Sequence, residues 1–378
     1  MKKYIYFDNA ATTVDKPECV SRAVYSALVR LGNPGRSGHD LSVSAASEVY
    51  NCRKVVCRLF GCDEPERVIF TANATTALNL AIKGYAADNS HILVSNLEHN
   101  SVIRPVHALS MDRNKGITYS IFDATGSDNE TVFDFLSKIK SNTKIAVVSL
   151  ASNVSGKILP VAKIAQACKS RGIRIICDAS QGAGCVPVNV KSLGVDVLCF
   201  AGHKSLYGPQ GTGGLIICCK DEPSCLIEGG NGINSADRNM TGLLPERLEA
   251  GTLNTPGLCG LAAGIEYISK IGINEIFERN TDLIDRLTDN LSNINGATLY
   301  GVSTVRTPTL IFNKKGLCSE ELASLLNERK ICVRGGFHCS PIAHVAYGTG
   351  ECGAVRASLS FANTFAETDT FALAVERI

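Results

Sequence analysis

From residue 67 to residue 218 the chain alternates short apolar runs with longer polar segments. The runs are Arg67-Val-Ile-Phe70, His91-Ile-Leu-Val94, Lys144-Ile-Ala-Val-Val-Ser-Leu150, Arg174-Ile-Ile-Cys-Asp178, Asp196-Val-Leu-Cys-Phe200 and Gly214-Leu-Ile-Ile-Cys218. Runs that are apolar throughout are typical of parallel strands buried on both faces. Between them, Pro160 to Arg171 has a helical pattern, with proline in its first turn and Gly172 after its end. The alternation predicts an α/β fold with a mostly parallel sheet between helices.

After Pro256 the pattern changes to long helical stretches with few strands. Residues 261–292 and 320–329 read as helices, and Thr307 to Phe312 and Ile331 to Arg334 read as strands. A chain of 378 residues also exceeds the roughly 250–300 residues at which single cores stop growing. We therefore predict a large α/β domain over residues 15–255 and a smaller α+β domain formed by residues 1–14 and 256–378.

The composition fits a globular protein with a small-molecule ligand. Apolar residues make up 45% and charged residues 20%, and the formal net charge is +2 with no block of lysine and arginine. This pattern argues against binding to nucleic acid or to a membrane surface. No run approaches the roughly 18–20 apolar residues that span a bilayer, and the N-terminus lacks the apolar stretch of a signal peptide. We expect a cytoplasmic protein.

The chain has 16 cysteines, which fall largely in apolar strands and include no C-x-x-C pair. They are interpreted as reduced thiols, and no metal site is expected. Cys339 differs in its surroundings, because it lies between His338 and Ser340 with a further histidine at position 344. No fourth ligand is in register for a metal, which leaves a nucleophile or a buried thiol.

Polar residues follow several of the predicted strands, and in open α/β sheets ligands bind beyond these carboxyl ends. The turn after Phe70 opens a helix and offers N–H groups and hydroxyls to an anion. Asp178 ends one strand, and His203-Lys204 follows the next. An amine for a Schiff base, a carboxylate for a pyridine nitrogen and an anion cup are what pyridoxal 5′-phosphate requires. A structural Asp–Lys pair and nucleotide binding remain alternatives.

Motifs along almost the whole chain resemble the class V aminotransferase group of fold-type I pyridoxal-phosphate enzymes. Within it they are similar to cysteine desulfurases and selenocysteine lyases, and the short segment around Cys339 is like that of the family's second group. The motifs are Tyr6-Phe-Asp-Asn-Ala-Ala-Thr12, Asn33-Pro, Asn73-Ala-Thr-Thr-Ala-Leu-Asn79, Glu98-His-Asn100, Asp178-Ala-Ser-Gln181, Gly202-His-Lys204, Glu249-Ala-Gly-Thr-Leu-Asn254, Arg334-Gly-Gly-Phe-His-Cys339 and Val355-Arg-Ala-Ser-Leu-Ser-Phe361.

The resemblance implies a complete cofactor site. Lys204 would form the Schiff base and move protons, and Asp178 would pair with the pyridinium nitrogen. His99 would stack on the ring and assist acid–base steps. Asn153 and Gln181 would bond the phenolic oxygen of the cofactor. The phosphate would be held by Ala74, Thr75 and His203. In a homodimer, Thr252 would reach the phosphate bound in the partner subunit.

The resemblance also implies the substrate and the chemistry. Arg356 would clamp a substrate carboxylate, with Asn33 and Arg334 as further substrate-binding residues. Cys339 would attack the sulfur of L-cysteine, giving a persulfide and alanine and then passing sulfur to an acceptor protein. Neighbours such as His338 and Arg334 are expected to favour its thiolate. L-selenocysteine remains open as the main substrate, because selenium can leave without the cysteine.

Two positions depart from the family pattern. Ala201 stands where a serine usually bonds the phosphate, which removes a hydrogen bond worth roughly 1.5–3 kcal/mol unless Ser205 or another group replaces it. Asn73 stands at a turn position that is often glycine.

Two alternative functions are disfavoured. Another enzyme on the same fold is disfavoured because it has no use for Cys339. A thiol protein that delivers sulfur without a cofactor is disfavoured because it needs neither Lys204 nor Asp178.

Overall fold

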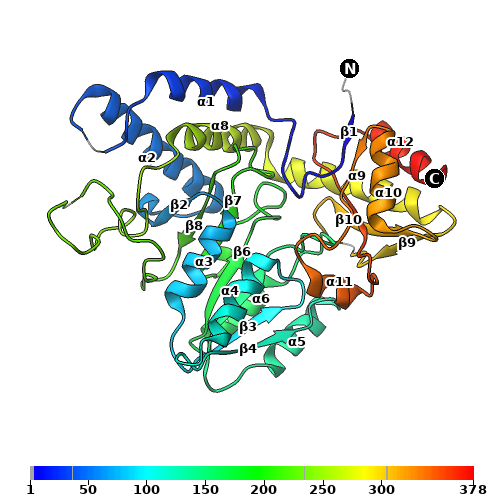
Figure 1. The fold of residues 1–378 in the computed structure, drawn as a ribbon, viewed down its shortest axis with the longest axis horizontal. Coiled ribbons are helices and arrows are strands. Elements are labelled where there is room, and N and C mark those ends of the chain that lie inside the picture. The colour runs from blue at the N-terminus through cyan, green and yellow to red at the C-terminus, as the bar shows by residue number, and fades with distance from the viewer. Residues whose placement is uncertain (1–3, 36, 234, 304) are drawn as a thin grey trace.

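A seven-stranded sheet forms the centre of the larger part of the molecule (Figure 1). The computed structural model describes residues 4–35, 37–233, 235–303 and 305–378, and the sheet has the strand order β2-β8-β7-β6-β5-β3-β4. The strands are β2 (Val68–Thr71), β3 (His91–Ser95), β4 (Thr118–Phe122), β5 (Thr143–Ser149), β6 (Arg174–Asp178), β7 (Val197–Ala201) and β8 (Gly213–Ile217). Strands β3 to β7 pair in parallel, and β8 is antiparallel to β7 and β2. The predicted mostly parallel sheet is confirmed.

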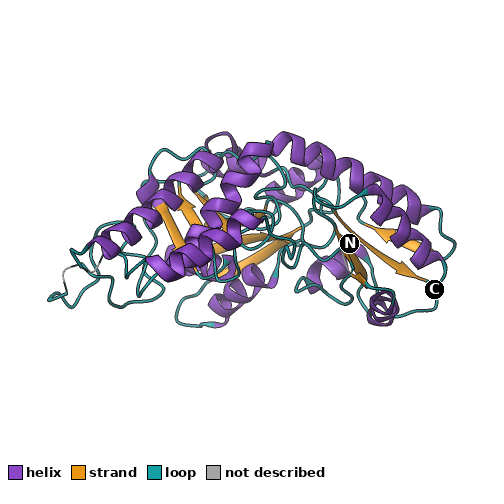
Figure 2. Ribbon diagram, turned by 90° about the horizontal axis from the view of Figure 1, so that it is seen from above, coloured by secondary structure: helices purple, strands orange, loops and turns teal. Residues whose placement is uncertain are grey.

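Helices cover both faces of this sheet, as Figure 2 shows. Successive strand residues point to opposite faces of the sheet, so the side chains of one apolar run pack into two hydrophobic cores, one on each face. Ile92 and Val94 belong to one core with α3 (Ala74–Tyr85) and α4 (Asn100–Met111). Leu93 belongs to the other. The helices of that second core include α2 (Asp40–Phe60), α6 (Val161–Lys169) and α8 (Thr255–Ile271). With both faces covered, the carboxyl ends of the strands are the edge left for a ligand.

A third core lies around the three-stranded sheet β12-β10-β9. Its strands and helices are β9 (Ala297–Tyr300), β10 (Thr309–Lys314), β12 (Val355–Ser358), α9 (Ile273–Ser292), α10 (Ser319–Glu328) and α12 (Phe365–Glu376). The chain's first strand, β1 (Ile5–Tyr6), pairs in parallel with β11 (Ile331–Cys332). Phe7 packs in this core near Phe371, with ring centroids 5.4 Å apart. The N-terminal segment thus joins the C-terminal part of the chain (Figure 1).

The remaining helices are α1 (Glu18–Arg30), η1 (Pro65–Arg67), α5 (Asp128–Ser137), α7 (Val190–Leu193) and α11 (Pro341–Tyr347). Helix α8 carries Leu258, Leu261 and Ile265 into the core beneath the large sheet. It therefore packs with the large sheet, although it follows the predicted boundary at residue 255. The division into folding units stays a prediction. No described helix is both long and apolar enough to cross a membrane.

Candidate active site

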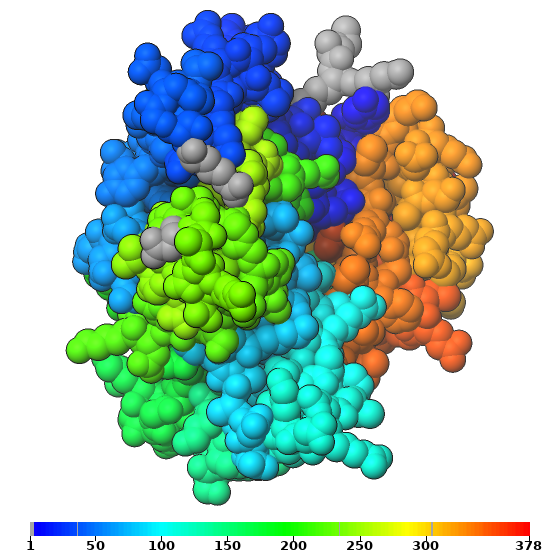
Figure 3. Space-filling view, turned by 60° about the vertical axis from the view of Figure 1, so that its left-hand side comes forward, coloured from blue at the N-terminus to red at the C-terminus, as the bar shows by residue number. Residues whose placement is uncertain are grey.

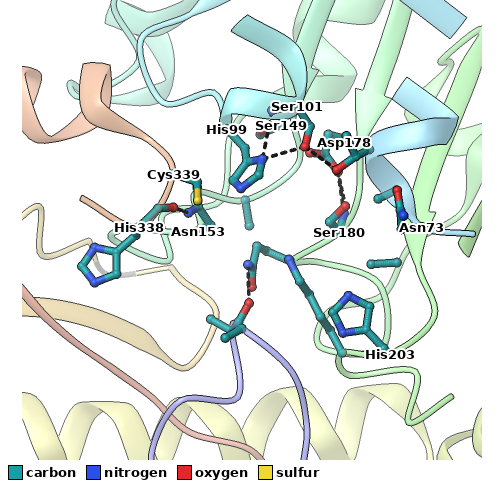
Figure 4. Close-up of a pocket in the computed structure, with 18 of the residues that line it drawn as sticks. Asn73, His99, Ser101, Ser149, Asn153, Asp178, Ser180, His203, His338 and Cys339 are labelled. Carbon is teal, nitrogen blue, oxygen red and sulfur yellow. Dashed lines mark hydrogen bonds between the residues drawn. The ribbon is translucent and has the colours of Figure 1, made fainter. Parts of the chain in front are cut away.

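A cavity of about 220 Å³ lies at the carboxyl ends of the parallel strands (Figure 4). Strands β5, β6 and β7 end there with Ser149, Asp178 and Ala201. The opposite wall comes from the C-terminal part of the chain. Most of the predicted site residues line this one cavity: Ala74, Thr75, His99, Asn153, Asp178, Gln181, His203, Lys204, Arg334, Cys339 and Arg356.

Lys204 and Asp178 both face the cavity but do not pair with each other. Burial lowers the pKa of Lys204 to about 8, against the opposing effect of the Asp178 carboxylate. The Lys204 amine has no hydrogen bond or ion pair among the described residues. Ser180 donates to one oxygen of Asp178 through its N–H, at 2.9 Å, and through its hydroxyl. The second Asp178 oxygen has no partner in the part of the chain that the structure describes. The alternative of a structural Asp–Lys pair is therefore wrong.

His99 presents an N–H group to the cavity. It is the N-cap of α4, and the backbone N–H of Ser101 donates to its Nδ1 at 3.0 Å. Burial, followed by the charge of Lys204, lowers the pKa of His99 to about 4, so the ring is neutral. In a neutral imidazole ring whose Nδ1 accepts a hydrogen bond, the proton is on Nε2, and this is the N–H group of His99 that the cavity receives.

The N-terminus of α3 forms the anion-binding end of the cavity. Asn73 caps this helix, because its side-chain oxygen accepts the N–H of Thr76 at 2.9 Å. Within the described residues the N–H groups of Ala74 and Thr75 have no partner, and the helix dipole adds positive potential there. Asparagine at position 73 is therefore compatible with the turn. Ser205 contacts Cys185 Sγ at 2.9 Å and does not line the cavity, so its hydroxyl does not replace the one missing at Ala201.

Arg356, in β12, is the most deeply buried cation of the site, with 2% of its surface exposed. Its guanidinium donates to Asp8 at 2.8 Å and to the backbone oxygen of Asn153 at 3.1 Å. Its buried Nε–H has no partner among the described residues. A buried unpaired donor costs free energy unless a ligand accepts from it. Asp8 and Asn153 thus hold the Arg356 guanidinium in place at the cavity wall.

Cys339 lies on a strained turn held by the rest of the site. His338 and Cys339 both have positive φ, 52° and 57°, a conformation that costs non-glycine residues roughly 1–3 kcal/mol each. The N–H of Asn100 donates to the Cys339 carbonyl at 2.8 Å, and the Asn153 amide donates to the His338 carbonyl at 2.8 Å. Ser340 donates to the Asn153 side-chain oxygen at 2.7 Å. These bonds fix the exposed thiol at the cavity wall.

His338 does not support the Cys339 thiolate as the sequence suggested. Its ring points away from the cavity (Figure 4), with Nε2 donating to the Arg334 carbonyl at 3.0 Å and Nδ1 2.9 Å from His344 Nε2. Burial, followed by Arg356, lowers the pKa of His338 to about 3. A neutral ring with both nitrogens occupied supplies no charge to the thiol. Its role is instead to close the turn onto Arg334.

Asn33 and Thr252 are the predicted site residues that the single chain does not bring to this cavity. Both line a separate cavity of about 400 Å³ near α2. The role of Thr252 in a partner's site stays a prediction, and contact between Asn33 and substrate would also require a second subunit. No group of three His, Cys, Asp or Glu side chains suited to a metal occurs among the described residues.

Sequence reasoning missed the residues that hold the functional groups in place. They are Asp8, Asn100, Ser101 and Ser180. Asp8 and Asn100 lie inside motifs already identified, at Tyr6–Thr12 and at Glu98–Asn100. The partners of Asp8 and Asn100 are distant in sequence, so no local pattern indicates them, whereas Ser101 and Ser180 bond His99 and Asp178 only two residues away.

The lowered pKa of Lys204 predicts how its amine reacts with acid anhydrides. Only the neutral amine is nucleophilic, so acetylation of the ligand-free protein by acetic anhydride should rise through about pH 8. The pH midpoint is measured by mass spectrometry of the Lys204 peptide. In Asp178→Asn an anion that stabilises the ammonium form is lost, and the midpoint should move lower. An unchanged midpoint in that variant contradicts the electrostatic effect of Asp178 on the Lys204 amine.

Comparisons with known proteins agree with this geometry. Residues 5–371 match the family model described as aminotransferase class-V. A probable cysteine desulfurase from Pyrococcus abyssi is 33% identical over 100% of this chain and 94% of its own length. Probable cysteine desulfurase 1 from Mycobacterium leprae is 31% identical over 100% of this chain, but the chain spans only 62% of that relative's length.

A solved structure has the same fold across nearly the whole chain. The apo structure of the cysteine desulfurase from Thermococcus onnurineus NA1 has a TM-score of 0.91 at 32% identity, covering 99% of this chain and 94% of that one. The chain therefore belongs to the class-V aminotransferase family, in its cysteine desulfurase branch. The family and the fold class predicted from the motifs are confirmed.

Proposed function

We propose that this protein is a cysteine desulfurase that converts L-cysteine to L-alanine and receives the sulfur on Cys339 as a persulfide for an acceptor protein. The observation that carries the proposal is one cavity lined by the Lys204 amine, the Asp178 carboxylate and the Cys339 thiol. An amine and a carboxylate without a thiol would fit many enzymes of this fold. The thiol on its fixed turn favours attack on a substrate sulfur.

The residues present fit pyridoxal 5′-phosphate, on which this family generally depends. The described residues offer an unpaired amine, a free carboxylate oxygen and two unpaired helix N–H groups, which match its aldehyde, pyridine nitrogen and phosphate. Lys204, Asp178 and the N-terminus of α3 with Thr75 would hold those groups. His99, Asn153, Gln181 and His203 would surround the ring and phosphate. When bound, the cofactor withdraws electrons from the substrate's α-carbon.

The chain's own residues then have separate tasks. Arg356 binds the substrate carboxylate, and Lys204 takes the α-proton because its pKa of about 8 leaves part of the amine neutral near pH 7. The Cys339 thiolate attacks the substrate sulfur, forming the S–S bond as the Cβ–S bond breaks. The electron pair left on Cβ takes up a proton, with Lys204 and His99 as the nearby groups that carry one. Lys204 returns a proton to the α-carbon, and alanine results.

A homodimer is the proposed assembly. Apolar side chains more than half exposed gather on α1 and α2, at Tyr25, Leu28, Val29, Leu41 and Val43, and on the segment before α8, at Ile227 and Leu243. Figure 3 shows α1, α2 and that segment on one face. Apolar surface of this kind marks an interface. A second subunit there would also use Asn33 and Thr252, which line the cavity between α2 and that segment.

L-selenocysteine is the second candidate substrate. Cys339 is held by Asn100 and Asn153 rather than carried on a long free loop. A selenolate leaves without help from a thiolate, so a fixed nucleophile restricts cysteine turnover more than selenocysteine turnover. The cytoplasmic location and the acceptor protein remain predictions.

The direct test uses the purified protein loaded with pyridoxal 5′-phosphate. With L-cysteine it should form alanine, and mass spectrometry of the intact protein should find one added sulfur atom that a reductant removes. Peptide mapping should locate this sulfur on Cys339. Alanine formation without any sulfur on Cys339 contradicts the proposed route, and no alanine from either substrate contradicts the activity.

A further inference from the structure

A chain of short hydrogen bonds connects the anion-binding end of the cavity to His99. Thr75 Oγ1 lies 2.7 Å from Ser101 Oγ, and Ser101 Oγ lies 2.8 Å from His99 Nδ1. All three residues line the cavity, and Ser101 is 7% exposed. Thr75 is in the first turn of α3 and Ser101 in the first turn of α4, so the chain joins two helix N-termini.

The directions of these bonds follow from counting protons. His99 Nδ1 accepts the Ser101 backbone N–H at 3.0 Å and therefore bears a lone pair. The single hydroxyl proton of Ser101 then points to Nδ1. Ser101 Oγ in turn accepts the hydroxyl proton of Thr75. With no anion bound, both Ser101 donors are directed to His99.

An anion at the N-terminus of α3 changes this order. Thr75 has one hydroxyl proton, and a phosphate is a stronger acceptor for it than a serine oxygen. Once Thr75 donates to the anion, its oxygen is free to accept from Ser101 at the same 2.7 Å contact. One hydroxyl proton does not serve Thr75 and His99 together. Nδ1 therefore loses the Ser101 hydroxyl and becomes a better proton acceptor.

We propose that Ser101 is a positioning residue that couples occupation of the anion site to the proton affinity of His99. The inference rests on the proposed function, in which the anion is the phosphate of the cofactor and His99 assists proton transfer. Among the described residues, Ser101 Oγ has no partners besides Thr75 and His99. Helix capping does not need this hydroxyl, because the His99 side chain caps α4 through the Ser101 backbone N–H.

The experiment uses cofactor-free protein labelled with ¹⁵N-histidine and titrated with inorganic phosphate. The His99 Nδ1 resonance, assigned by its loss in His99→Gln, should shift in a saturable manner in the wild type. In Ser101→Ala most of that shift should be lost while phosphate still binds. Ser110→Ala is the matched control in the last turn of α4, because within the described part of the chain its hydroxyl bonds only the His107 carbonyl, at 2.8 Å. This variant should respond as the wild type does.

The possible outcomes separate the inference from the function on which it rests. If the charge of the phosphate acts on His99 directly, the Nδ1 resonance shifts equally in the wild type and in Ser101→Ala. That result overturns the coupling while leaving the proposed function intact. No saturable phosphate response in any variant overturns the anion site and with it both proposals. Ser101→Thr keeps a hydroxyl at this position and should recover the phosphate-dependent Nδ1 shift that Ser101→Ala loses.

Discussion

Replacing Lys204 with alanine should reduce alanine formation from cysteine to background. General acid–base catalysis by one residue contributes roughly 10²–10⁴-fold, and Lys204 is also the unpaired amine at the cavity wall that would bond the cofactor. The wild type loaded with pyridoxal 5′-phosphate should be yellow, and borohydride should fix the cofactor covalently to the Lys204 peptide. The variant should give no such fixation. Absorbance, peptide mass and alanine release measure the three effects.

Lys16 provides a matched control for this experiment. Burial lowers its pKa to about 8, as for Lys204, and its amine donates to the His203 carbonyl at 3.3 Å outside the cavity lining. Lys16→Ala should keep the covalent fixation at Lys204. Fixation on the Lys16 peptide in the wild type, or its persistence in Lys204→Ala, would contradict the assignment of the amine.

Replacing Cys339 with alanine should separate the two candidate substrates. Cysteine turnover should disappear, because no other thiol lines the described cavity to attack the substrate sulfur. Part of the selenocysteine turnover should survive, because a selenolate is a better leaving group than a thiolate. Alanine, sulfide and selenide are measured with each amino acid in turn.

Cys352 is the control for this second variant. It is also an exposed free thiol, but it lies outside the cavity. Cys352→Ala should keep both activities. Full cysteine turnover in Cys339→Ala contradicts the assignment of Cys339 as the nucleophile. Equal loss of both activities indicates that Cys339 is also needed for selenocysteine turnover.

The fold was predictable where strands are buried on both faces. All of the apolar runs identified between residues 67 and 218 are strands of the seven-stranded sheet. Strand β4 was not predicted. It lies at the edge of the sheet, where Thr118 is exposed and Tyr119 to Ile121 are only half-buried. An edge strand of this kind has no continuous apolar run to indicate it.

The residues of the site were predictable from their motifs, but their contacts were not. His338 was expected beside the thiolate because it is adjacent to Cys339 in sequence. Positive φ at both residues turns the ring away, and burial keeps it neutral. Likewise, Asn153 was expected to bond the phenolic oxygen of the cofactor, and the motifs did not indicate that its side chain also bonds His338 and Ser340. Such contacts depend on how distant segments pack.

The bond between Asp8 and Arg356 sets when the site can assemble during biosynthesis. The two residues are 348 positions apart, so Asp8 leaves the ribosome long before its partner has been made. Strand β1 meets β11, and Phe7 enters the C-terminal core, only after most of the chain has been translated. The large sheet can form earlier from contacts that are closer in sequence. A nascent chain stalled before residue 355 would therefore carry Lys204 and Asp178 on a folded sheet but would lack Arg356, the residue proposed to bind the substrate carboxylate.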